Sequence, residues 1–488
     1  MPSRSVHRSL RALSASVALA VAAGCAGGSQ TSLPTTIPSQ TLQSAIKNVV
    51  VIYQENWSFD ALYGSFPGAN GFASASAAQT MPQIDKVSGA PISVEPQPLN
   101  NGQPDANLAA VAGTPIAPYA LTSYISPAVL TGDIVHRFYQ EQSQIDGGKM
   151  DKFVSWSDNP GLVFSNFDAS SLPEGQLAKS YVMADNFFHS AFGGSFLNHQ
   201  WLICACTPTF SGAPSSAVAV VDSSTKQLAL DGNGKIVHDG FVTPDGFAVN
   251  TAFTVNAPHP ATAAAANLVP NQTNPTIGDR LSAAGVTWKW YSGGWNNALA
   301  GNPDPLFQYH HQPFAYYAAY ADGTAAKAVH LQDETNFTAD LQNGTLPAVS
   351  FVKPLGQNNE HPGYASLAAG QQHVADLVSA IQASKYWKNT AIVITYDENG
   401  GRWDHVPPPA PADRWGPGSR VPAIVISPWS RHNYVDHTQY ETSSILAFIE
   451  KVYGVAPLGA RDSAANPLSN AFDFAQLGPY ALSGNRAK

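Results

Sequence analysis

The chain has 488 residues, a formal net charge of −9 and only 12% charged residues, with 39 glycines and 37 prolines. This length can bury a large core as one elaborated domain, and the composition indicates a loop-rich globular protein rather than a disordered or coiled-coil one. The negative charge and the lack of Lys/Arg runs argue against a nucleic-acid partner.

The N-terminus predicts an export signal over residues 1–25. Basic residues precede an apolar segment, residues 12–23, that is too short to anchor in a bilayer. It leads into Ala22-Ala23-Gly24-Cys25, which is similar to a bacterial lipoprotein processing site, with Ala where Leu is usual. We expect lipidation at Cys25, the alternative being cleavage nearby and release. The mature protein would be a periplasmic or outer-membrane-anchored lipoprotein, or secreted, and would touch the membrane only through this anchor.

A flexible tether is predicted over residues 26–44, which are rich in Ser, Thr, Pro and Gln. The globular part, residues 45–488, opens with the apolar strand pattern of residues 48–53. Later strand patterns alternate with helical ones, which predicts an α/β fold with a mostly parallel sheet sandwiched between helices. The strand patterns lie at residues 286–291, 347–352, 391–396 and 421–426, and the helical ones at residues 373–384 and 443–453.

Residues 207–275 differ in character, with Asp-Gly turns at residues 231–234 and 245–246. They predict a β-rich, antiparallel insertion or cap over the sheet edge. Just before them, Cys204 and Cys206 are two residues apart, a spacing at which the side chains diverge in a strand or a helix. We therefore expect them to be buried small hydrophobes rather than a disulfide.

Two of the predicted strands end in oxygen-bearing side chains. Glu55 and Asn56 follow the first strand, and Asp397 and Glu398 follow the strand at residues 391–396. Ligands bind at the carboxyl ends of strands in open α/β sheets, so the two endings together favour a cation site over solvated strand ends or helix caps. All-oxygen ligation predicts one divalent ion, Ca²⁺, Mg²⁺ or Mn²⁺ more than Zn²⁺. A second ion held by histidines stays open.

A nucleophile candidate, Ser195, follows the glycine pair at residues 193–194 and opens a helical pattern. At a helix N-terminus its alkoxide would be stabilised, although a simple N-cap is the commoner role for such a serine. Several histidines lie just beyond predicted strand ends, where they could converge, although a lone histidine is more often structural. The histidines concerned are His136, His310, His311, His361 and His405.

The segment at residues 49–60 (VVVIYQENWSFD) resembles the opening motif of the bacterial phosphoesterase family of acid phosphatases and phospholipases C, which is related in fold to alkaline phosphatases. Later motifs follow in the family's order, and the resemblance covers about residues 46–462. The serine motif is similar to the acid phosphatase branch, since the Asn-Pro-Asn-Arg of the phospholipase branch is absent. The later motifs are DGGKMD (146–151), GGSFLNH (193–199), EHP (360–362), YDENGGRWDHVPPP (396–409) and GSRVP (418–422).

The resemblance implies that Ser195 takes the phosphoryl group and that its oxygen completes a metal shell. It assigns the other metal ligands as Glu55, Asn56, Asp397 and Glu398, and it places four histidines around the phosphate or as acid and base: His136, His310, His311 and His361. Trp57 stands where the family usually has Arg, which predicts altered packing or substrate contact. The role of His405 is open.

The expected function is metal-dependent hydrolysis of phosphate monoesters on small phosphorylated substrates, through a phosphoserine intermediate. Charged histidines at the phosphate would give an acidic to neutral pH optimum. The alternative is a phospholipase C that cleaves the headgroups of phospholipids. A third hypothesis, from another class, is a non-catalytic lipoprotein that binds a phosphorylated ligand.

Overall fold

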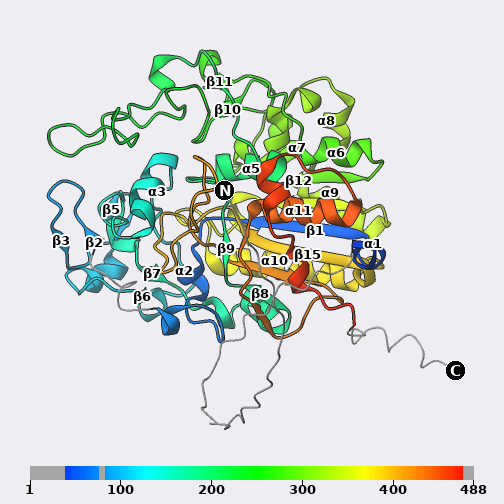
Figure 1. Cartoon of the computed structure of the whole chain (residues 1–488), viewed down its shortest axis with the longest axis horizontal. Coiled ribbons are helices and arrows are strands. Elements are labelled where there is room, and N and C mark those ends of the chain that lie inside the picture. The colour runs from blue at the N-terminus through cyan, green and yellow to red at the C-terminus, as the bar shows by residue number, and fades with distance from the viewer. Residues whose placement is uncertain (1–38, 76–82, 476–488) are drawn as a thin grey trace, which may run out of the picture. The chain divides into compact units, whose positions relative to one another are not determined.

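The computed structural model describes residues 39–75 and 83–475, and its centre is an eight-stranded sheet (Figure 1). The strand order is β13-β12-β14-β1-β15-β16-β8-β17, and only β16 runs antiparallel to its neighbours. The predicted α/β class with a mostly parallel sheet is thereby confirmed. The strands are β1 (Asn48–Gln54), β8 (Val182–Ala184), β12 (Trp288–Ser292), β13 (Leu331–Asp333), β14 (Val349–Lys353), β15 (Thr390–Tyr396), β16 (Ala423–Ile426) and β17 (Tyr434–Asp436).

The two middle strands of the fold, β1 and β15, are buried along their whole length. They pair in parallel from Asn48↔Thr390 to Gln54↔Tyr396, and β14 pairs with the other side of β1. Parallel strands buried on both faces read as continuous apolar runs, which is why the sequence predicts them well. Because the register ends at Gln54 and Tyr396, the residues that follow each strand leave the sheet at the same edge.

Helices flank the sheet. α11 packs against α5 and α1, and α10 packs against α4. The helices expected at residues 373–384 and 443–453 correspond to α10 and α11, and the left-handed Gly454 (φ 68°) caps α11. The helices are α1 (Ser39–Ala45), α2 (Phe59–Tyr63), α3 (Phe138–Ile145), α4 (Pro173–Ser180), α5 (Ser195–Cys204), α6 (Ile277–Ala283), α7 (Trp295–Leu299), α8 (Ala325–His330), α9 (Glu334–Asn343), α10 (Leu367–Ala383), α11 (Thr442–Tyr453) and α12 (Ala460–Ala464).

Pairs of short strands lie outside the main sheet. They are β2 (Gln83–Ile84) with β3 (Pro91–Ile92), β4 (Leu99–Asn100) with β5 (Gln103–Pro104), β6 (Tyr119–Ala120) with β7 (Ser165–Asn166), β9 (Phe187–Phe188) with β18 (Tyr440–Glu441), and β10 (Phe253–Thr254) with β11 (Leu268–Val269). Within the described ranges, none of the helices combines the length and hydropathy that a membrane span requires.

Two expectations for the N-terminal part fare differently. The export signal with Cys25, and most of the predicted tether, lie outside the described residues. The end of the tether, residues 39–44, is not flexible chain but part of α1. Leu42 on this helix is fully buried and belongs to the main core, so apolar packing against α11 overrides the polar composition that suggested a linker.

The segment at residues 207–275 contains the predicted turns but little regular strand. An antiparallel bridge between Leu230 and Ile236 encloses the first turn, where Asp231 accepts hydrogen bonds from the backbone of Asn233 and Lys235. The regular strands described here, β10 and β11, are two residues long and parallel. The segment is therefore mainly loops joined by isolated bridges.

The prediction that Cys204 and Cys206 do not bond each other is wrong, because the two residues form a disulfide. The helix α5 ends at Cys204, and Ala205 adopts a left-handed conformation (φ 48°, ψ 37°). This turn reverses the chain and brings the two Cα atoms to 5.1 Å, within the range for a disulfide. The prediction assumed a continuous helix or strand and so missed the cap.

Candidate active site

The residues that follow β1 and β15 meet at one edge of the sheet. Glu55, Asn56, Asp397 and Glu398 are all fully buried there. The close approach depends on Gly400, which has a φ of +61°, and a Cβ on it would lie 2.3 Å from the backbone oxygen of Asn56. Only glycine combines this φ with this contact, which explains the glycine two residues after Glu398.

Three buried oxygens in this cluster form no hydrogen bond within the described part of the chain: Asn56 Oδ1, Asp397 Oδ2 and Glu398 Oε1. Burial, and then the charge of Glu55, raise the pKa of Asp397 to about 7, while burial and Asp397 raise the pKa of Glu398 well above its usual value. Buried carboxylates without partners are costly, and a cation among them removes the cost. Carboxylate and amide oxygens therefore fit a hard divalent ion at this position.

Ser195 is the first residue of α5 and lines the same cavity as Glu55. The loop before it is tightly held. Gly193 (φ +87°) would place a Cβ 2.5 Å from the backbone nitrogen of Phe138, and its own N–H donates to Glu141 Oε2 at 2.6 Å. The predicted nucleophile thus lies at a fixed helix N-terminus beside the acidic cluster.

A second group of buried ionisable side chains is centred on Glu55, the chain neighbour of Asn56. Glu55 Oε1 is 2.6 Å from Lys353 Nζ and 2.5 Å from His311 Nε2. Burial opposes ionisation of Glu55, but His311 and Lys353 keep its pKa well below the usual value. Burial lowers the pKa of His311 to about 4, so this imidazole is neutral at neutral pH, and the ion pair of Glu55 is with Lys353.

His199 stacks on His311, with ring centroids 4.8 Å apart. Its Nδ1 donates to the backbone oxygen of Ser195 at 2.7 Å, and its buried Nε2 has no hydrogen-bond partner among the described residues. Ligand atoms of His199, His311 and Glu55 lie within 4.8 Å of one another. Neutral imidazole nitrogen is a metal ligand, so this group fits the second ion that the sequence left open.

The four predicted histidines converge on one cavity of about 210 Å³. His136 Nε2 is 3.2 Å from Asn56 Nδ2 and 3.6 Å from Glu398 Oε1, and its ring lies 5.5 Å from that of His361. A cavity of this size accommodates a phosphoryl group with a small substituent. Its lining is Glu55, Asp133, His136, Ser195, Thr251, Gln308, His310, His311, His361 and Tyr364.

Two residues with open roles lie outside the cavity. His405 is buried, and its Nδ1 lies 2.7 Å from Asp60 Oδ2 in an ion-pair network that includes Asp404 and Arg420. Trp57 is also buried; its indole stacks on the Arg402 guanidinium at 4.0 Å. Of the two expectations for Trp57, the structure supports altered packing and leaves no exposed surface for substrate contact.

Sequence reasoning missed Lys353, His199 and Tyr364 as site residues. Tyr364 donates to Glu55 Oε2 at 3.1 Å. A signal existed for two of them: Lys353 is the one charged residue of β14, and His199 lies one helical turn after Ser195. Tyr364 lies in a loop and carries no comparable pattern.

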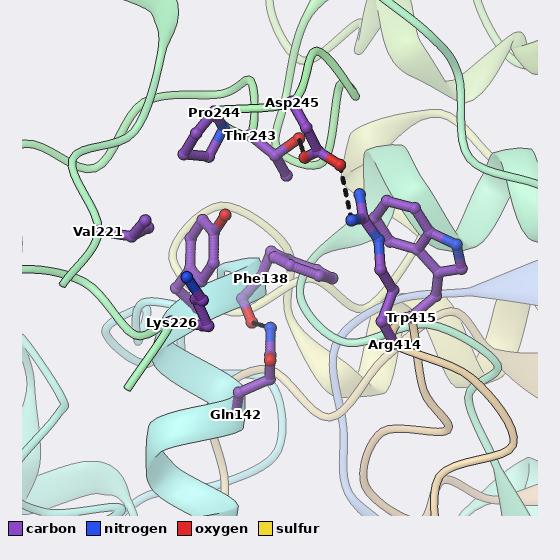
Figure 2. Close-up of a pocket in the computed structure, with 10 residues that line it drawn as sticks. Phe138, Gln142, Val221, Lys226, Thr243, Pro244, Asp245, Arg414 and Trp415 are labelled. Carbon is purple, nitrogen blue, oxygen red and sulfur yellow. Dashed lines mark hydrogen bonds and ion pairs between the residues drawn. The ribbon is translucent and has the colours of Figure 1, made fainter. Parts of the chain in front are cut away.

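A larger pocket of about 530 Å³ lies apart from this site, between α3 and the loops that carry Asp245 and Arg414 (Figure 2). Its lining shares no residue with the cavity at Ser195. Arg414 Nη1 is paired with Asp245 at 2.7 Å, and its guanidinium stacks on Trp415. Within the described chain, this pocket contains no counterpart to the serine and the histidines of the smaller cavity, so the smaller cavity is the better candidate for chemistry.

Comparisons with known proteins agree on one family. The model of the phosphoesterase family matches residues 46–456. A non-hemolytic phospholipase C of Pseudomonas aeruginosa is 24% identical over 470 residues, which cover 88% of this chain and 57% of that protein. Phospholipase C B of Mycobacterium tuberculosis is 24% identical over 472 residues, covering 88% and 78% of the two chains. The chain thus spans little more than half the length of the Pseudomonas relative.

Among solved structures, a protein of the alkaline phosphatase superfamily from Vibrio parahaemolyticus is similar with a TM-score of 0.33 and 10% identity, over 67% of each chain.

Proposed function

The chain belongs to the phosphoesterase family, and we propose that it hydrolyses phosphoric esters with Ser195 as the nucleophile. The observation that carries this proposal is the convergence of Ser195 and four histidines on one cavity. One of these histidines, His136, also contacts the buried cluster of Asn56, Asp397 and Glu398, in which three oxygens have no hydrogen-bond partner among the described residues. No part of the pocket in Figure 2 offers a comparable set of nucleophile, acid and base.

Ser195 transfers its proton to a histidine of the cavity and attacks the phosphorus, and the bond to the leaving alcohol breaks as the phosphoserine forms. When bound by Asn56, Asp397 and Glu398, a divalent cation supplies positive charge at the serine and phosphate oxygens. Lys353 holds Glu55 ionised. Water then attacks the phosphoserine, and Ser195 regains its proton.

The leaving alcohol needs a proton donor on the side of the cavity that faces solvent. The side chains of His136 and His361 are 18% and 10% exposed, whereas that of His311 is 4% exposed. Burial also lowers the pKa of His310 well below its usual value, so His310 and His311 are poor cationic partners for phosphate. We therefore assign the acid and base roles to His136 and His361. His310 and His311 would instead bind a metal ion or orient the substrate.

Phospholipase C-type cleavage of phosphodiester headgroups is the proposed activity, because the long matches are to proteins named phospholipase C. Phosphomonoester hydrolysis is the second candidate, and one observation favours it: the serine motif at residues 193–199 lacks the Asn-Pro-Asn-Arg of the phospholipase branch.

The test compares p-nitrophenyl phosphorylcholine with p-nitrophenyl phosphate, using wild type, Ser195→Ala, and chelated enzyme with metal add-back. Faster turnover of the diester supports the phospholipase proposal, and faster turnover of the monoester overturns it in favour of the second candidate. Inactivity on both, with a soluble metal-loaded protein, would favour the non-catalytic binding hypothesis.

Export and lipidation at Cys25 remain part of the proposal. An N-terminal lipid anchor outside the cytoplasm would hold the cavity close to phospholipid headgroups. The mass spectrum of the mature protein tests this: acylation of Cys25 is expected, and an unmodified N-terminus beyond Cys25 would contradict it.

A further inference from the structure

Glu360 lies in the loop after β14, directly before the proposed acid–base residue His361. Its side chain is fully buried, and its φ is +72°, a left-handed conformation that is uncommon outside glycine. A Cβ on Gly370 of α10 would lie 2.1 Å from Glu360 Cγ, so α10 has room for this side chain only with glycine at position 370. A strained, buried acid packed this closely needs surrounding contacts that hold it in place.

Four hydrogen bonds hold Glu360. Its Oε1 accepts from Gln54 Nε2 at 3.0 Å, and its Oε2 accepts from the Tyr396 hydroxyl at 2.7 Å and from Gln371 Nε2 at 3.3 Å. The backbone oxygen of Glu360 accepts from Trp57 Nε1 at 3.0 Å. Each carboxylate oxygen therefore faces at least one donor.

Three of these donors are direct chain neighbours of the proposed metal ligands. Gln54 precedes Glu55, Trp57 follows Asn56, and Tyr396 precedes Asp397. Gln54 and Tyr396 are the last residues of β1 and β15, and both contact Glu360, while the residues that follow them form the acidic cluster. The ends of β1 and β15 and the loop of His361 are thus joined through one carboxylate.

We propose that Glu360 is a positioning residue that sets the spacing between the metal-holding oxygens of β1 and β15 and the His361 imidazole. This inference rests on the proposed function. It also explains the Trp at position 57: the indole N–H fixes the Glu360 backbone, while the ring covers Arg402. Partners behind a metal site orient its ligands, and their loss commonly weakens metal affinity or activity about 10- to 100-fold.

The test is Glu360→Gln, which keeps the shape but turns one acceptor into a donor that faces another donor. Mn²⁺ affinity is measured by calorimetric titration, together with kcat, KM and the thermal midpoint. We expect Mn²⁺ to bind about 10- to 100-fold more weakly and kcat to fall more than KM changes. The double variant Gln54→Glu/Glu360→Gln lets the new amide donate to the new carboxylate, and we expect it to recover most of the Mn²⁺ affinity.

The matched control is Asp436→Asn on the edge strand β17. Asp436 is also fully buried and also accepts from a tyrosine hydroxyl and an amide, those of Tyr440 and Asn470, at 2.8 Å each. A merely structural role for Glu360 predicts that both variants lose stability and that neither changes Mn²⁺ affinity.

Wild-type Mn²⁺ affinity in Glu360→Gln, or no recovery in the double variant, would overturn the proposal. If Glu360→Gln does not fold, Tyr396→Phe replaces it, since it removes the 2.7 Å bond to Glu360 together with the longer bonds of the same hydroxyl to Glu174 and Gln371. A several-fold loss of Mn²⁺ affinity is expected, and unchanged affinity overturns the proposal. A wild type that binds Mn²⁺ but cleaves no phosphoric ester would refute the proposed function, while the affinity comparison still decides the role of Glu360.

Discussion

Lys353 Nζ lies 2.6 Å from Glu55 Oε1, and neither side chain has any exposed surface. The ammonium also donates to the backbone oxygen of Tyr53 at 3.0 Å, so Lys353 is bound to the carboxyl end of β1. A buried pair of this kind keeps the carboxylate ionised, and one partner without the other is an uncompensated charge in the core.

The first prediction follows from this pair. Lys353→Met should lower the free energy of unfolding by about 3–5 kcal/mol, because Glu55 is left buried without its cation. Urea denaturation of the metal-free protein measures this loss. The double variant Lys353→Met/Glu55→Gln should recover much of the stability but not the hydrolytic activity. Full activity in either variant would contradict the role assigned to Glu55.

The second prediction concerns pH. Because the pKa of Asp397 is raised to about 7, its contribution to the stability of the metal-free protein is present below about pH 4 and is lost as pH rises through about 7. Divalent cations bind the ionised form, so the gain in thermal midpoint on adding Mn²⁺ should be large at pH 8 and small at pH 5.

Activity should therefore fall as pH drops below about 7. This differs from the acidic to neutral optimum expected from charged histidines, because burial keeps His310 and His311 neutral. An Mn²⁺-induced gain that is the same at both pH values, or that is greater at pH 5, would show that Asp397 does not bind the ion.

The third prediction uses a pair of glycines. Gly400→Ala should weaken Mn²⁺ binding and lower activity, because its Cβ would collide with the backbone of Asn56. Gly102→Ala is the control: it has a similar φ of +73° but open space around the Cβ. The control should lose only about 1–2 kcal/mol from backbone strain, with unchanged Mn²⁺ affinity. Equal effects on Mn²⁺ affinity in the two variants would refute the collision argument.

The fourth prediction concerns the cysteines. Thiol titration of the denatured mature protein should find two thiols from Cys204 and Cys206 only after reduction. Cys204→Ser should leave Cys206 reactive in the unreduced, denatured protein. Two free thiols before reduction would show that the bond does not form in the native chain.

The family resemblance, the α/β class and the long strands could be predicted from the sequence, because buried parallel strands are continuous apolar runs. The acidic strand ends were visible in the sequence because Glu55 and Asp397 follow apolar runs. The register of β1 and β15 then brings them to one edge of the sheet. The disulfide was missed because it depends on one left-handed residue, Ala205. Lys353 and Glu360 were missed because their importance lies in partners some 300 residues away in the chain.

The central claim is that Ser195 takes the phosphoryl group, and peptide mass spectrometry after rapid acid quench and proteolytic digestion tests it most directly. During turnover of the better of the two chromogenic substrates, wild type should carry a phosphoryl or phosphodiester adduct on the peptide that contains Ser195. Ser195→Ala should carry no adduct and should lose activity roughly a thousandfold or more. Near-normal turnover by Ser195→Ala, or an adduct on another residue, would contradict the account.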